Sequence, residues 1–174
     1  MKIKFVIIII SVFLLILGCV VVVEELTYSP LTENDFKNLF PNYDNSAKKK
    51  CDVDFIGLSL HGELFDIFTY ELSDVTIDNS YPSINDSWTN ITASDELVVS
   101  VWKRIPIDSL TLIRCKDIFD LGNHRGKRCC SSFVSELSNP INFYSYVYVN
   151  ELEYYFYLYC PDKHYLYYVR KRGW

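Results

Sequence analysis

The sequence predicts an α+β fold: an antiparallel β-sheet with a C-terminal three-stranded meander and two or three short helices packed on it. Two observations indicate the sheet. Residues 51–77 and 142–172 are rich in β-branched and aromatic residues, and polar turns interrupt both stretches. A third observation indicates the helices, because other segments repeat apolar residues at helical spacing. The 155 residues after Cys19 suit one domain.

A short helix is expected at the start of the domain. Thr32 can cap it, and Asp35 three residues later completes a capping box. Phe36, Leu39 and Phe40 form its apolar stripe. Residues 42–50 read as a polar loop. Strands are predicted at 55–60 and 63–72, as a hairpin broken at His61-Gly62, and residues 78–90 form a turn-rich loop.

Two further helices are predicted from apolar spacing. The first has Ser94 as its cap and Pro106 as its stop, although its valines leave a strand as the alternative. Its apolar face is Leu97, Val98, Val101, Trp102 and Ile105. The second precedes Asn139-Pro140 and shows the same spacing at Cys129, Cys130, Phe133, Val134 and Leu137. Residues 110–128 show no pattern that assigns them.

The C-terminal meander consists of strands near 142–149, 154–160 and 165–172, joined by two four-residue turns. The first turn predicts that Val149 faces Tyr154. Six tyrosines would then share one face, because side chains alternate along a strand: Tyr144, Tyr146, Tyr148, Tyr155, Tyr157 and Tyr159. The opposite face would carry Phe143, Val147, Val149, Phe156, Leu158 and Cys160. The third strand adds Tyr168, Arg170 and Arg172 to the tyrosine face.

This tyrosine ladder has two interpretations. Cross-strand aromatic pairs stabilise a sheet, and helices can cover them. Alternatively, exposed tyrosines form a flat amphipathic platform for a protein or a sugar ring. The candidate binding residues are Tyr144, Tyr146, Tyr148, Tyr155, Tyr157, Tyr159, Tyr168 and Arg170, with binding expected at the open edge near the last two.

Charge is distributed unevenly along the domain. Residues 51–102 contain ten Asp or Glu and no Lys or Arg, whereas residues 103–174 contain eleven Lys or Arg and seven Asp or Glu. Either the two parts neutralise each other within the fold, or an acidic face awaits a basic partner. The net charge of −5 argues against a nucleic-acid partner.

The cysteines and other reactive side chains form no catalytic or metal-binding set, so no cofactor is expected. Five cysteines follow Cys19: Cys51, Cys115, Cys129, Cys130 and Cys160. Because five is an odd number, they cannot all pair with one another in an oxidising compartment. The three histidines lie far apart in the sequence. A hydrolase built on acidic residues therefore ranks below a binding function.

The N-terminus directs the chain out of the cytoplasm. Lys2 and Lys4 precede an apolar run at 5–23, which suits a membrane or a translocation channel. The run could be a secretory signal, an uncleaved transmembrane anchor or a lipoprotein signal. Ile16-Leu17-Gly18-Cys19 resembles the lipobox of bacterial lipoproteins. This resemblance implies cleavage before Cys19 and diacylation of that cysteine, and two acyl chains suffice for stable anchoring.

The expected organisation is a signal peptide at 1–18, a tether at 19–31 and one α+β domain at 32–174. Small size, anchoring, the acidic segment and the lack of a catalytic set favour a non-enzymatic envelope lipoprotein that binds a protein, such as an inhibitor or a toxin-immunity protein. A glycan-binding surface lipoprotein that uses the tyrosine ladder is the alternative.

Substituting Cys19 tests the lipoprotein interpretation. Cys19→Ser should abolish labelling by radioactive palmitate and leave the precursor uncleaved, because the lipobox cysteine is both the acylated residue and the cleavage signal. Intact-mass measurement of the wild-type protein should show loss of residues 1–18 and a gain of acyl chains. A mature protein that retains Met1 would instead favour the uncleaved anchor.

Overall fold

The computed structural model describes Val12, Phe13, Leu15 and residues 30–57, 63–83, 97–123 and 128–173. Residues 31–174 form a compact unit, separate from residues 1–30. This larger unit contains the α+β fold that the sequence predicts, including the C-terminal meander.

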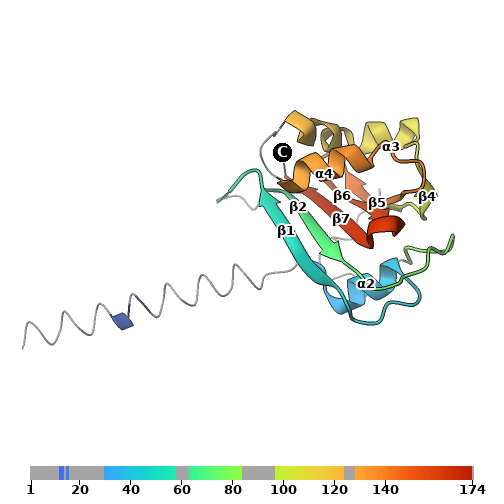
Figure 1. The fold of residues 1–174 in the computed structure, drawn as a ribbon. Helices are drawn as coiled ribbons and strands as arrows, with labels where there is room; N and C mark the ends of the chain where they lie inside the picture. The colour runs from blue at the N-terminus through green and yellow to red at the C-terminus, as the bar shows by residue number, and fades with distance from the viewer. Residues whose placement is uncertain are drawn as a thin grey trace, which may run out of the picture. The chain divides into compact units, whose positions relative to one another are not determined.

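A seven-stranded antiparallel sheet forms the centre of the unit (Figure 1). The meander β5-β6-β7 supplies its middle, and the N-terminal hairpin adds β2 beside β7, with β1 next to β2. Two-residue strands pair with the other side of β5. The bounds are β1 Lys48–Asp54, β2 Leu64–Glu71, β3 Val98–Val99, β4 Lys103–Arg104, β5 Phe143–Asn150, β6 Glu153–Cys160 and β7 Tyr165–Arg172.

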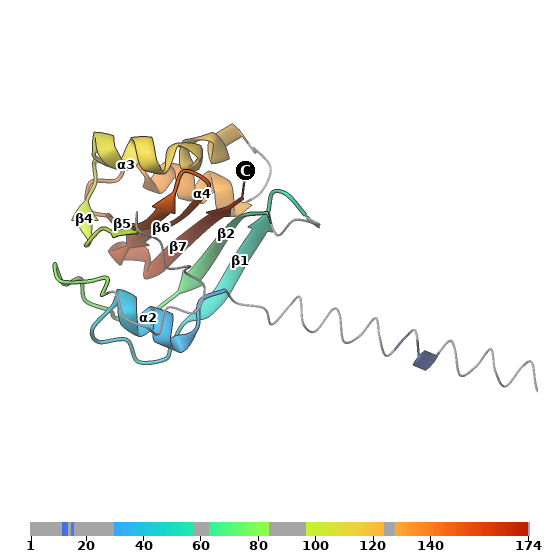
Figure 2. The same cartoon turned by 180° about the vertical axis from the view of Figure 1, so that it is seen from behind.

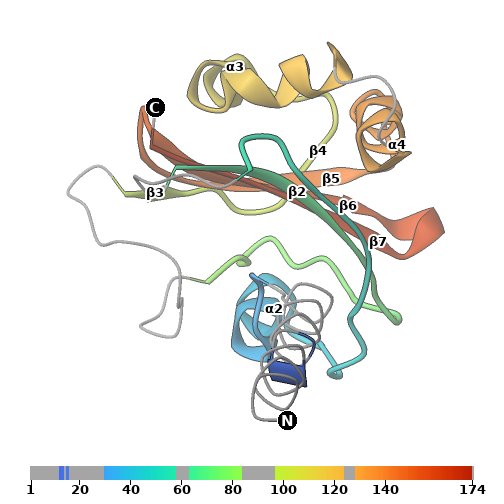
Figure 3. The same ribbon diagram turned by 90° about the vertical axis from the view of Figure 1, so that its left-hand side faces the viewer.

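Helices cover both faces of the sheet (Figures 2 and 3). On one face lie α3 (Ser109–Arg114), the 3₁₀ helix η1 (Lys116–Asn123) and α4 (Arg128–Glu136). On the other lies α2 (Glu33–Leu39). Each face therefore has its own apolar core, and a second 3₁₀ helix, η2 (Pro161–Lys163), joins β6 to β7.

The predicted capping box of α2 is confirmed. The Thr32 hydroxyl accepts a hydrogen bond from the Asp35 backbone N–H, and the Asp35 carboxylate accepts one from the Thr32 backbone N–H at 2.8 Å. Phe36, Leu39 and Phe40 are buried against the sheet. Trp102 stabilises the C-terminal end of α2, because its indole N–H donates a hydrogen bond to the Leu39 carbonyl oxygen at 2.9 Å.

Of four further predicted elements, the structure corrects two and confirms two. The expected helix from residue 97 to 105 is wrong: this segment contains the short strands β3 (Val98–Val99) and β4 (Lys103–Arg104), which hydrogen-bond to the free side of β5, so the strand alternative holds for the two valines. The predicted strand at 55–60 is wrong where the structure describes it, because residues 55–57 are not in a strand and the first strand, β1, begins at Lys48, within the predicted loop, and ends at Asp54. Strand β2 and helix α4 are confirmed. Ser94 and the hairpin break at His61-Gly62 lie outside the described residues.

The predicted register of β5 against β6 is wrong by one residue. A bulge between Tyr148 and Asn150 makes Tyr148 face Tyr154 and makes Tyr146 face Phe156. A slip of one residue turns every side chain of a strand to the other face. The six tyrosines therefore do not share a face, whereas the predicted pairing of β7 with β6 holds, since Tyr168 lies beside Tyr157 and Arg170 beside Tyr155.

The register predicts which aromatic residue the helix-covered core depends on. Phe156 is fully buried and contacts the rings of Phe133 and Tyr144. Phe156→Ala should lower the free energy of unfolding by about 3–5 kcal/mol, because it leaves a cavity. Urea unfolding of a fragment starting at Leu26 measures this. The control is Leu152→Ala in the adjoining turn, where the side chain is 52% exposed and the expected change is within about 0.5 kcal/mol.

Candidate functional site

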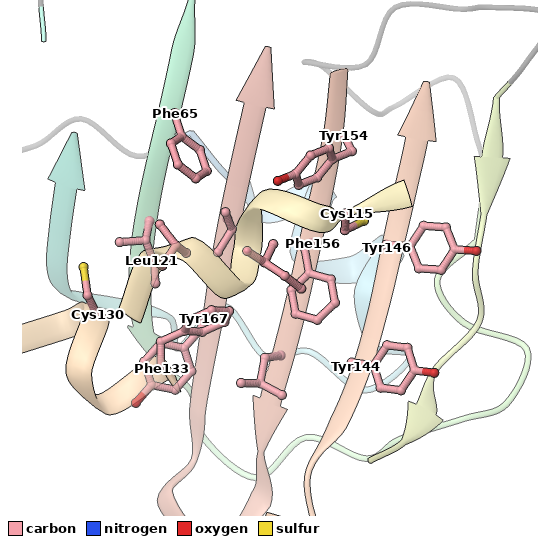
Figure 4. Packing of buried hydrophobic residues seen from close by; sticks show 14 of the residues in the cluster. Phe65, Cys115, Leu121, Cys130, Phe133, Tyr144, Tyr146, Tyr154, Phe156 and Tyr167 are labelled. Carbon is pink, nitrogen blue, oxygen red and sulfur yellow. The ribbon is translucent and has the colours of Figure 1, made fainter. Parts of the chain in front are cut away.

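Three of the candidate tyrosines face the helices α3, η1 and α4. Tyr144 and Tyr146 are buried and Tyr148 is partly buried in the core on that side of the sheet. Figure 4 shows the first two close to Phe156 on the adjacent strand, with Tyr154 and Tyr167 farther across the same face and η1 crossing the strands. Their rings are therefore part of the core and do not form an open platform.

The other candidate tyrosines lie on the α2 face. Tyr155, Tyr157, Tyr159 and Tyr168 are each at most 3% exposed. The rings of Tyr155 and Tyr157 stack on that of Tyr168, with centroids 6.3 and 5.2 Å apart. Burial raises the pKa of Tyr157 and Tyr168 well above the ordinary value and that of Tyr159 to about 12. The tyrosines are therefore divided between two cores: the prediction of one shared face is wrong, and their burial under helices agrees with the structural interpretation of the ladder and not with an open platform.

Arg170, the charged member of the predicted site, belongs to a buried ion pair. Its Nε donates to Asp66 Oδ2 at 2.6 Å, and its guanidinium lies 5.4 Å from the ring centroid of Phe68. Both charged side chains are at most 10% exposed. Burial raises the pKa of Asp66; Arg170 opposes this shift, and the neighbouring Asp54 carboxylate adds to it. The pair links β2 to β7 and does not present Arg170 to a ligand.

Charge pairing also bears on the acidic segment at 51–102. Asp66 pairs with Arg170 from the basic part of the chain, and Glu71 pairs with Lys50. These contacts favour internal neutralisation of the segment over a single acidic face reserved for a partner.

Two buried tyrosine hydroxyls fix the position of α3. The Tyr144 hydroxyl accepts from the Asp108 backbone N–H at 3.0 Å and donates to the Asp108 carboxylate at 2.9 Å. Asp108 also caps α3 by accepting from the Thr111 N–H. At the other end of the helix, Arg114 donates to the Tyr146 hydroxyl at 2.8 Å. Buried hydroxyls need hydrogen-bond partners, so the polar side of α3 faces the two tyrosines of the sheet.

As a result, α3 has a polar inner side and an apolar outer side, which is the reverse of the usual amphipathic pattern. Thr111 is fully buried, whereas Leu110, Leu112 and Ile113 are 49%, 39% and 72% exposed. A surface helix ordinarily buries its apolar side and exposes polar residues. We call the exposed side chains of this region the α3–η1 surface: Leu110, Leu112, Ile113, Lys116 and Phe119.

The 3₁₀ helix η1 extends this surface because it repeats every three residues. Cys115, Ile118 and Leu121 point into the core and are fully buried. Lys116 and Phe119 lie on the outer side, and Phe119 is 40% exposed. Four of the ten large apolar side chains exposed in the described residues therefore lie between positions 110 and 119. Concentrations of this kind commonly mark interaction sites.

Sequence reasoning missed the α3–η1 surface. Its residues fall in the segment that no periodicity assigned, since the outward apolar residues obscure the 3.6-residue period. Two signals were nevertheless present. Asp108 followed by Thr111 suits a helix start, and Cys115, Ile118 and Leu121 recur every three residues.

The described residues offer little reactive chemistry. Cys115 and Cys160 are free thiols, but both are buried, and burial raises their pKa. Cys51 is disulfide-bonded. No group of three or more His, Cys, Asp and Glu side chains in the described ranges is arranged to hold a metal ion.

The predicted lipidation residue, Cys19, lies outside the described residues. In the part of the chain that the structure describes, no helix combines the length and apolar character needed to span a membrane. Comparison with known proteins gave no match, whether to family models, to curated proteins or to solved structures.

The buried pair Asp66–Arg170 should control stability in a pH-dependent way. Arg170→Met leaves the carboxylate buried without its cation, which should cost about 3–5 kcal/mol near neutral pH. The folded-state pKa of Asp66, already raised, then rises further above the unfolded value of about 3.9. The stabilisation that follows from a raised folded-state pKa is fully present at pH values below the unfolded pKa of Asp66. The Arg170→Met variant loses this stabilisation as the pH rises through the folded-state pKa of Asp66.

Urea unfolding between about pH 4 and 8 measures this deficit, which should grow with pH. The matched control combines Asp66→Asn with Arg170→Met. This double variant removes both charges and should lose less stability at neutral pH than Arg170→Met alone. A deficit for Arg170→Met that does not change with pH would show that the buried charge is not its cause.

Proposed function

We propose that this chain is a bacterial cell-envelope lipoprotein whose domain binds a protein partner and does not catalyse a reaction. An inhibitor or a toxin-immunity protein fits this description. The reversed polarity of α3 is the observation that carries the binding proposal. The packing of the described residues does not require Ile113 to be apolar, because its side chain is 72% exposed, and Leu110 beside it is 49% exposed.

The anchoring part of the proposal rests on the N-terminal sequence. The lysines, the apolar run and Ile16-Leu17-Gly18-Cys19 together suit a lipoprotein signal. A lipid at Cys19 would hold the domain at a membrane surface through the residues before α2. The helices α3 and η1 cover the face of the sheet opposite to α2 (Figure 3). A partner can therefore bind the α3–η1 surface without contacting α2.

The glycan alternative loses its basis in the tyrosine ladder. A sugar-binding platform needs aromatic faces open to solvent, whereas Tyr144, Tyr157 and Tyr168 are each 1% exposed. A thiol-based activity is also poorly supported, because a raised thiol pKa lowers the fraction of reactive thiolate at neutral pH.

Photo-crosslinking in the native host tests the binding proposal. The full-length protein would carry p-benzoylphenylalanine in place of Ile113, which is 72% exposed, so folding should be unaffected. Irradiation should give a discrete protein adduct on a denaturing gel. The same amino acid at Leu152, 52% exposed in the β5–β6 turn, is the control and should give none. Equal adduct patterns at the two positions, or no adduct at Ile113, would contradict the proposal.

A further inference from the structure

The α3–η1 surface carries positive charge, although the whole chain is acidic. Two carboxylates near it whose side chains the structure describes, those of Asp108 and Asp117, are paired inside the domain. Asp108 accepts from Lys103 at 2.8 Å, and this bond, with those from Thr111 and Tyr144, outweighs burial and holds the pKa of Asp108 well below the ordinary range. Asp117 pairs with the buried Lys171. Neither acid is available to neutralise the remaining cations.

Two cations of this region, Arg114 and Lys116, form no ion pair with a side chain that the structure describes. Arg114 donates to the Tyr146 hydroxyl and lies over the Tyr148 ring. Lys116 is exposed and forms no ion pair with any side chain that the structure describes. Lys116 therefore places a positive charge among the apolar side chains of this surface.

Lys116 lies between two apolar side chains of the α3–η1 surface. It follows Ile113 by three residues and precedes Phe119 by three, so apolar side chains lie before and after the ammonium group along the outer side. A partner that covers Ile113 and Phe119 also removes water from Lys116. Burying an ammonium group without a counter-charge is costly, so the partner must supply an acceptor.

From this we infer that the partner is a protein segment with a carboxylate flanked by apolar side chains, and that the carboxylate pairs with Lys116. The inference rests on the proposed function and specifies its partner. An anionic lipid surface could also meet an apolar and cationic patch. The net charge of −5 disfavours it, because an acidic protein is repelled from a negatively charged surface, whereas one short-range ion pair depends only on local charge.

The test uses the full-length protein with p-benzoylphenylalanine at position 113 and varies Lys116. Lys116→Glu should lower the yield of the protein adduct about tenfold, because it places like charges together in a partly desolvated contact. Lys116→Gln should lower it less, and Lys116→Arg should preserve it. Lys37→Glu is the matched control: it makes the same change of net charge at an exposed position of α2, on the other face of the sheet, and should leave the yield unchanged.

The outcomes separate the two proposals. A protein adduct whose yield is the same for Lys116→Glu and the wild-type protein would overturn the acidic partner while leaving protein binding intact. An equal loss for Lys37→Glu would attribute the effect to net charge and would likewise overturn the pairing with Lys116. An adduct that mass spectrometry identifies as lipid, or the absence of any adduct, would overturn both proposals.

Discussion

Strand β6 buries all eight of its side chains, and the architecture follows from that constraint. A strand with one wet face needs cover on one side only, whereas β6 presents large apolar groups on both. Phe156 and Leu158 require the layer of α3, η1 and α4, and Tyr157 and Tyr159 require α2. The domain is therefore a sheet between two helical layers, and its centre has no solvent-facing side on which an aromatic platform could form.

The same constraint explains which features the sequence could predict. The capping box of α2 and the apolar spacing of α4 are local signals, so both helices were predictable. Register is readable when polar residues mark one face of a strand. In β5 and β6 both faces are aromatic or aliphatic, so the four-residue turn was the remaining guide. A bulge near Val149 shifts the register by one residue, so Tyr144, Tyr146 and Tyr148 lie on the face opposite to the predicted one.

Tertiary contacts decided the segments that local patterns misassigned. Val98 and Val99 pair with β5 because that strand would otherwise leave its outer side without a neighbour, and this pairing overrides the helical spacing. In α3 the tyrosine hydroxyls of the sheet select a polar inner side, so the helix lacks the apolar inner stripe by which helices are recognised. Neither requirement is visible without the partner strand.

The tyrosines thus relate to binding indirectly. Tyr144 and Tyr146 were candidates for contact with a ligand, yet their rings fill the core and their hydroxyls hold Asp108 and Arg114 at the two ends of α3. With both ends fixed, the helix cannot rotate to bury Ile113 without leaving these buried polar groups unpaired. The interactions that keep the hydroxyls satisfied therefore also keep the apolar surface exposed in the isolated domain, which makes a partner the simplest means of removing Ile113 from water.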